Sequence, residues 1–176
     1  MPNYKRFRVS GGSYFFTVNL KNRNKNLLVE NIDVLREAVR EIRTRYPFKI
    51  DACVILPDHF HCVWTLPEGD SDFSLRLRLL KTAFSKTVPK TRSSSFIRNG
   101  RKEAGIWQRR FWEHGIRDQS DFNAHIDYVH INPVKHGLVS RVKDWPYSTF
   151  HRYVEEGVLP IDWGGDVEMD IGAAGE

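Results

Sequence analysis

The chain of 176 residues is long enough for one domain with a hydrophobic core, and its 40% hydrophobic residues exclude a disordered linker. No apolar run approaches the roughly 20 residues that a membrane-spanning helix requires, and the first residues carry no secretion signal, so we expect a cytoplasmic protein. The formal net charge of +5 gathers in basic segments that precede an acidic end. This distribution favours a polyanionic partner, with nucleic acid as the first candidate.

The first part of the chain alternates between strand and helix patterns. Residues 13–20, SYFFTVNL, are rich in aromatic and β-branched side chains and predict a strand. Residues 31–46 carry apolar side chains at nearly helical spacing and predict a helix. Residues 48–56 and 59–66 predict two strands that a tight turn joins into an antiparallel hairpin.

The second part begins with a helical pattern at residues 71–88, followed by a polar, basic loop at 89–105. The aromatic segment 106–117 predicts a fourth strand with a bend, and 119–137 predict another helix. The order is therefore β-α-β-β-α-β and then a helix, which is typical of a ferredoxin-like α+β fold. Such a fold places two helices on one face of an antiparallel sheet and leaves the other face for function.

Two histidines share one face of the predicted strand 59–66. Strand alternation sends Phe60, Cys62 and Trp64 to the core, so His59 and His61 point to the opposite face, with Cβ atoms about 6–7 Å apart. Two imidazoles at this spacing can meet one metal ion, but they need a third ligand. Taken alone, such a pair is more often two strand histidines with ordinary hydrogen bonds than a metal site.

The predicted helix 119–137, which Ser120 or Asp121 is expected to cap, offers candidates for the missing groups. Tyr128 and Asn132 are four residues apart and therefore lie on one face of this helix. Asn132 offers an amide oxygen as a ligand, and Tyr128 offers a phenol that can attack phosphorus. Pro133 disfavours helical geometry at Asn132, which predicts a kink or a helix end at this position.

Several longer stretches carry a resemblance to a known family. A pair of histidines around one hydrophobic residue, followed by a helical tyrosine, resembles the HUH single-strand nucleases. The chain is more specifically similar to the REP-associated tyrosine transposases of bacteria, from about residue 4 to residue 165. The stretches that carry this similarity are GGSYFFTVNL, LPDHFHCVWTLPEGD, IWQRRFWEHGIRD, YVHINPVKHGLV and DWPYSTFHRYV.

The resemblance implies a role for each candidate residue. His59 and His61 would bind a divalent metal ion, Mg²⁺ or Mn²⁺, and Asn132 would be its third ligand. Tyr128 would cleave single-stranded DNA near the hairpins of repetitive extragenic palindromes (REPs), form a 5′-phosphotyrosine and allow the DNA to be rejoined. We expect a catalytic domain at 1–145 and an extension with an acidic tail at 146–176, in a protein of the bacterial nucleoid.

The basic segments supply candidate DNA contacts, because Lys and Arg bind phosphates and Arg also stacks on bases. These candidates are Lys5, Arg6, Arg8, Lys21, Arg23, Arg109, Arg110, Arg117 and Lys135, with His136 next to the last of them. The acidic tail is a separate hypothesis, since it could fold over the basic surface and compete with DNA. The protein could act as a monomer or as a homodimer.

Two other functions remain open from the sequence. The chain could be a DNA-hairpin-binding protein without catalytic activity, or a zinc hydrolase that uses His59 and His61 with water. The hydrolase would need a carboxylate or a third imidazole beside the pair, and strand alternation sends Asp58 to the opposite face. Glu113 and His114 are expected to be structural or to face DNA, and they are reserve candidates for metal ligands.

Overall fold

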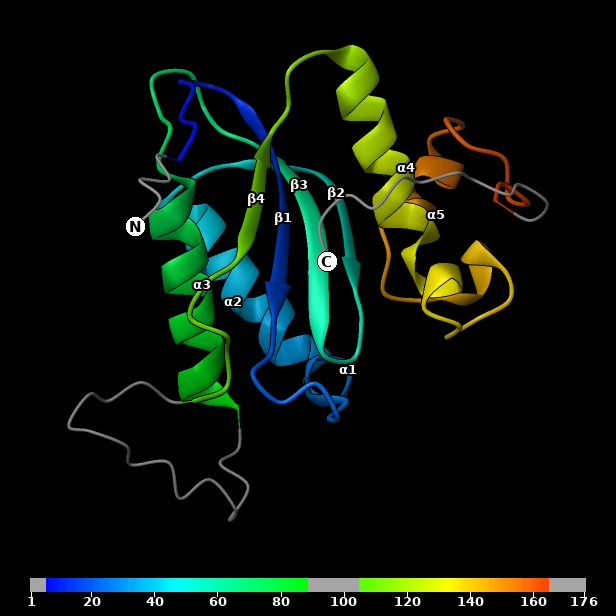
Figure 1. The fold of residues 1–176 in the computed structure, drawn as a ribbon, viewed down its shortest axis with the longest axis horizontal. Helices are drawn as coiled ribbons and strands as arrows, with labels where there is room; N and C mark the ends of the chain where they lie inside the picture. Colours follow the sequence, from blue (N-terminus) through cyan, green and yellow to red (C-terminus); the bar gives the residue numbers. More distant parts are fainter. Residues whose placement is uncertain (1–5, 89–104, 165–176) are drawn as a thin grey trace, which may run out of the picture.

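The computed structural model describes residues 6–88 and 105–164, so most of the predicted loop and the acidic end lie outside the described residues. The centre of the fold is an antiparallel sheet of four strands in the order β2-β3-β1-β4 (Figure 1). The strands are β1 (Ser13–Asn19), β2 (Lys49–Ile55), β3 (His59–Thr65) and β4 (Trp112–Gly115). This order and direction confirm the predicted ferredoxin-like α+β fold.

Side-chain alternation along β1 divides the protein into two cores. Tyr14, Phe16 and Val18 are buried against α2 (Ile32–Arg45) and α3 (Phe73–Thr87), which lie side by side on one face of the sheet (Figure 1). Most of the buried aromatic side chains lie in this larger core. Two helices therefore cover one face, as the sequence predicts.

The helix α4 (Gln119–Lys135) crosses the other face of the sheet and packs on β2 and β3 (Figure 1). Phe15 of β1 and Val63 of β3 are fully buried in this second core, together with Ile126 and Val129 of the helix. A helix thus covers the face that carries His59 and His61. The candidate site lies between one helix and the sheet.

The structure differs from the prediction at the fourth strand and just before α2. The fourth strand is shorter than the predicted 106–117, because only Trp112–Gly115 pairs regularly with β1, while Trp107 forms an isolated bridge with Leu20. A short helix that was not predicted, α1 (Leu27–Glu30), precedes α2. It has only four residues, too few to produce a helical pattern in the sequence.

The helix α4 begins at Gln119 as predicted, but its capping residue and its end differ from the prediction. Asp118 caps its start by accepting a hydrogen bond from the backbone N–H of Asp121 at 2.8 Å, so the predicted caps Ser120 and Asp121 are wrong. The helix also continues through Pro133, and His136 donates its backbone N–H to the carbonyl of Asn132 at 2.9 Å. Asn132 consequently stays in regular helix, despite the helix-breaking tendency of the proline after it.

The C-terminal segment packs on the edge of β2. It forms the 3-10 helix η1 (Val142–Asp144) and the helix α5 (Phe150–Glu155), and Ser148 pairs with Val54 of β2. On this edge, Ile55 donates its backbone N–H to the carbonyl of Tyr147 at 2.9 Å. Across residues 6–88 and 105–164, no helix is long and apolar enough to cross a membrane.

Candidate active site

The strand β3 presents His59 and His61 to the helix α4. They lie opposite Asn19 and Thr17 of β1, on the face that packs against the helix. Their side chains are almost completely buried, and their ring centroids are 4.9 Å apart. The structure therefore brings the two imidazoles together as strand alternation predicts.

A neighbouring side chain contacts the Nδ1 atom of each imidazole. His59 Nδ1 lies 2.7 Å from Asp58 Oδ1, and His61 Nδ1 lies 2.8 Å from the hydroxyl of Thr17. Arg23 in turn donates to the other carboxylate oxygen of Asp58 at 2.5 Å. These contacts at Nδ1 leave the Nε2 atom of each ring for a ligand. In metal sites, hydrogen-bond partners like Asp58 and Thr17 fix the orientation of the histidine rings. Asp58 thus contacts His59, although alternation alone sends it to the opposite face.

Burial keeps both imidazoles neutral. It lowers the pKa of His61 well below the usual value, and the nearby His59 and His136 lower it further. Burial also lowers the pKa of His59, although the Asp58 carboxylate opposes this effect. Neutral imidazoles have a lone pair for a metal ion, so no proton must leave these rings when a cation binds near neutral pH.

The helix α4 places Tyr128 and Asn132 beside the histidines. Both side chains are buried, and the Tyr128 ring lies 5.3 Å from the His61 ring. The Asn132 amide nitrogen donates to the Tyr128 carbonyl at 3.1 Å, which leaves its Oδ1 atom for another contact. The ammonium of Lys135 lies 4.9 Å from the centre of the Tyr128 ring. All four predicted catalytic and metal-binding residues therefore lie in one place.

Three buried polar atoms in this place have no hydrogen-bond partner among the described residues: His61 Nε2, Asn132 Oδ1 and Tyr128 Oη. Unsatisfied buried polar atoms are costly and therefore rare in folded proteins. An imidazole nitrogen and an amide oxygen are suitable donors for a divalent cation, and a phenol can approach a phosphate that the cation binds. The residues present fit a metal ion at this position.

His136, predicted from the sequence only as a DNA contact, is a third imidazole at the same place. It follows Asn132 by four residues and extends the row formed by Tyr128 and Asn132. One ring nitrogen from each of His59, His61 and His136 lies within 4.8 Å of the others. The four-residue spacing between Asn132 and His136 could have indicated in the sequence that both lie on one helix face. The kink or helix end predicted beside Pro133 indicated instead that regular helix does not continue to His136. His136 is exposed, unlike the other two.

A second polar cluster joins β4 to the start of α4. Asp121 accepts from His114 Nε2 at 2.8 Å and from the Arg117 backbone at 2.9 Å, and its other oxygen lies 3.1 Å from His125. Burial opposes ionisation of Asp121, yet these partners lower its pKa to about 2. The ring of Phe15 stacks on His61 and also contacts His125. His114, the reserve candidate for a metal ligand, therefore joins β4 to the first turn of α4, the helix that carries Tyr128.

The predicted DNA contacts come from several parts of the chain and have different partners. Arg23 and Lys135 lie at the site, beside Asp58 and Tyr128. Arg6 and Arg8 contact Ser74 of α3, and Arg6 also lies 3.6 Å from the buried Glu113. Arg117 contacts Asp121 at the start of α4. The remaining described candidates are exposed: Lys21, Arg109 and Arg110. Lys5 lies outside the described residues. Their roles in DNA binding stay predictions.

The fold and the histidine–tyrosine site define a transposase of the IS200-like type, and the family model described as "Transposase IS200 like" matches residues 8–132. The chain is 50% identical to the REP-associated tyrosine transposase of Escherichia coli K12, over 95% of this chain and 93% of the relative. It is 48% identical to a putative REP-associated tyrosine transposase of Haemophilus influenzae, over 97% of this chain and 98% of the relative.

Structural comparison agrees with these relatives. A solved structure of a REP-associated tyrosine transposase bound to a REP hairpin superposes with a TM-score of 0.83 at 50% identity, over 95% of this chain and 93% of that one. The chain belongs to the REP-associated tyrosine transposases, which confirms the resemblance inferred from its motifs and its assignment as an enzyme.

Proposed function

We propose that the protein cleaves and rejoins single-stranded DNA beside REP hairpins, with Tyr128 as the nucleophile and a divalent metal ion as the cofactor. One observation carries the proposal: Tyr128 Oη, Asn132 Oδ1 and His61 Nε2 are buried together without partners among the described residues. The hairpin is inferred from the DNA in the related solved structure. DNA as substrate places the protein in the bacterial cytoplasm, at the nucleoid.

His59, His61 and Asn132 would hold the metal ion, with Mg²⁺ or Mn²⁺ as the proposed identity. When bound, the ion would polarise a non-bridging oxygen of the scissile phosphate and stabilise the charge that develops there. An amide oxygen and a phosphate suit either ion, whereas the imidazoles favour Mn²⁺ over Mg²⁺. Asp58 and Thr17 would keep the two rings oriented through their Nδ1 atoms.

Tyr128 would attack the phosphorus atom of the scissile phosphate. Its oxygen forms the new bond to phosphorus as the bond to the 3′ oxygen breaks, and the phenol loses a proton while the 3′ oxygen gains one. The 5′-phosphotyrosine keeps the energy of the broken ester, so a 3′-OH can reverse the step and rejoin the strand. The Lys135 ammonium, 4.9 Å from the centre of the Tyr128 ring, adds positive charge where the phosphate would lie.

One chain contributes both the histidines and Tyr128, so we propose that a monomer can carry out the cleavage.

The buried Tyr128 and the unpartnered ligand atoms favour a catalytic protein over a hairpin-binding protein without catalytic activity, because the latter would need neither of them. The zinc hydrolase gains some support from the structure, because His136 supplies the third imidazole that this alternative requires. Its activity would not depend on Tyr128.

The test is a denaturing gel of the protein after incubation with single-stranded DNA that carries a REP hairpin, with Mg²⁺ or Mn²⁺. We expect a covalent protein–DNA adduct with the wild type and with Tyr46→Phe, a matched control outside the site, and none with Tyr128→Phe. Hairpin binding without any cleavage would favour the non-catalytic alternative. Cleavage that persists in Tyr128→Phe would favour hydrolysis by water.

A further inference from the structure

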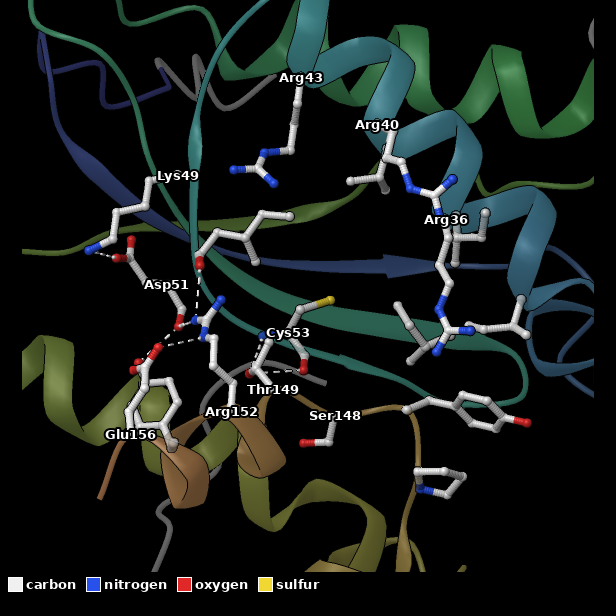
Figure 2. A pocket seen from close by; sticks show the side chains of 18 residues that line it. Arg36, Arg40, Arg43, Lys49, Asp51, Cys53, Ser148, Thr149, Arg152 and Glu156 are labelled. Atoms are coloured by element: carbon white, nitrogen blue, oxygen red, sulfur yellow. Dashed lines mark hydrogen bonds and ion pairs between the residues drawn. The ribbon is translucent and has the colours of Figure 1, made fainter. Parts of the chain in front are cut away.

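A groove of about 620 Å³ lies beside the outer edge of β2 (Figure 2), and none of the proposed catalytic residues lines it. The helix α2 forms one wall, and the segment from Pro146 to Glu156 forms the other. The β2 edge between them is partly covered, since Thr149 donates its backbone N–H to the Cys53 carbonyl at 2.9 Å. The groove is therefore a feature of how the C-terminal segment packs on the sheet.

The lining of this groove is strongly basic. Three arginines of α2, Arg36, Arg40 and Arg43, lie along one wall, and Figure 2 shows them on one side of the helix. Lys49 and Arg152 also line the groove, while only two lining residues are acidic, Asp51 and Glu156. Five cations against two carboxylates leave a net charge of +3 in the lining.

The two carboxylates are already used inside the groove. Asp51 is buried and pairs with Lys49 at 2.8 Å, and Glu156 lies 4.0 Å from Arg152. Arg36 and Arg40 also pair with Asp33 and Glu37 of α2, which do not line the groove, but these pairs are exposed and weak, so the arginines can turn to a phosphate instead. Positions 36, 40 and 43 follow one another on one helix face over about 10 Å, which is enough to meet two or three successive phosphates of one strand.

The floor of the groove differs from its wall. It is apolar, with Leu35 and Val39 of α2 and Ile50 and Ile55 of β2, and Tyr147 stands at its side. A basic wall beside apolar and aromatic side chains suits a strand whose bases are unpaired, because phosphates meet cations while base faces contact the floor. The volume is that of a small-ligand site, which fits nucleotides of one strand and is too small for a duplex.

We propose that this groove binds the unpaired DNA strand that continues from the hairpin. The proposal rests on the proposed function, since that function supplies a single strand with a hairpin. The position is suitable: Ile55 lines the groove, and the chain reaches His59 only four residues later, through the β2–β3 turn. The groove therefore reaches the end of β2 that leads, through this turn, to the strand of the catalytic histidines. None of the arginines in the groove is among the DNA contacts predicted from the sequence.

The test compares two double variants that remove the same charge. Arg36→Gln with Arg40→Gln removes two cations from the groove, while Arg45→Gln with Arg78→Gln removes two exposed cations outside it. Within residues 6–88 and 105–164, Arg36 and Arg40 form ion pairs with Asp33 and Glu37 of their own helix, and such exposed pairs contribute little to stability, so both proteins should fold. All proteins also carry Tyr128→Phe and are measured without metal, so binding is separated from cleavage.

Fluorescence anisotropy measures the affinity of each protein for oligothymidine of about 20 nucleotides and for a blunt REP hairpin. For the groove variant we expect about tenfold weaker oligothymidine binding, and a dependence of log affinity on log salt that is smaller by about 1.4, which corresponds to two lost phosphate contacts. The blunt hairpin should bind equally to both variants.

Equal oligothymidine affinity in the two variants would overturn the proposal. An equal loss of hairpin affinity in the groove variant would also overturn it, because the groove would then bind duplex DNA. A wild-type protein that forms no covalent adduct would contradict the proposed function instead, and this comparison of affinities would still decide where the single strand binds.

Discussion

At the scale of single residues, His136 has the clearest testable role. Its ring centroid lies 5.0 Å from that of His59, and one of its nitrogens lies within 4.8 Å of both other imidazoles. We propose that His136 joins His59, His61 and Asn132 as a fourth metal ligand, and we therefore expect His136→Gln to weaken Mn²⁺ binding about tenfold, because one imidazole ligand is lost. Isothermal titration calorimetry on the DNA-free protein measures this change. The control His151→Gln removes an imidazole elsewhere, and equal affinity in both variants would exclude His136 as a ligand.

The same residues show how far sequence reasoning reaches. Strand alternation was sufficient to place His59 and His61 on one face, because the period of a strand is independent of its tertiary contacts. The approach of His136 could not be predicted in this way, since it depends on where α4 crosses the sheet and on the helix continuing past Pro133. Packing of the helix prevailed over the local preference of the residue before proline.

At the scale of elements, the start of α4 depends on Asp121. This carboxylate accepts hydrogen bonds from His114 and from the Arg117 backbone, and its side chain is 8% exposed. We expect Asp121→Asn to lower the free energy of unfolding by about 1–3 kcal/mol, because the charged acceptor of a buried network is lost. Urea unfolding measures the change. Asp118→Asn is the matched control, since asparagine also caps helices well, and an equal loss in both variants would contradict a special role for Asp121.

The contact between α4 and α5 carries a pH dependence. His130 is fully buried beside Tyr153 and Trp163, and it shares a hydrogen bond of 2.9 Å with the Thr149 hydroxyl. Burial first, and then the nearby Arg152 and His151, lowers its pKa from 6.5 to about 4. As the pH decreases, His130 therefore binds a proton at a higher pH in the unfolded chain than in the folded chain. The free energy of unfolding consequently falls as the pH decreases from 6.5 towards 4.

This proton linkage predicts a loss of up to about 3 kcal/mol across that pH window, with a pKa shift from 6.5 to about 4. Thermal unfolding at a series of pH values measures the loss, and His130→Gln is the comparison because glutamine can still bond to Thr149. The variant should lose less stability than the wild type between pH 6.5 and 4. Parallel curves for the two proteins would show that other groups cause the acid sensitivity.

At the scale of the whole molecule, the segment after Trp145 acts as part of the catalytic body. Phe150 is fully buried with Ile131 of α4 and Val142 of η1, and Thr149, Arg152 and Tyr153 bond to backbone groups of β2. The predicted domain boundary at residue 145 stays a proposal. These contacts show what residues 1–145 would lose if they were produced without the C-terminal segment. A chain cut there would expose the β2 edge and an apolar face of α4, and exposed edge strands favour aggregation.

We therefore expect a chain that ends at Trp145 to melt about 10 °C or more below the full chain, because loss of one buried phenylalanine alone costs about 3–5 kcal/mol. A chain that ends at Gly164 keeps all of these contacts and is the matched control, with a melting temperature within about 2 °C of the full chain. Differential scanning calorimetry measures both. An unchanged melting temperature for residues 1–145 would establish them as an independent domain, and the C-terminal segment would then serve the groove rather than the fold.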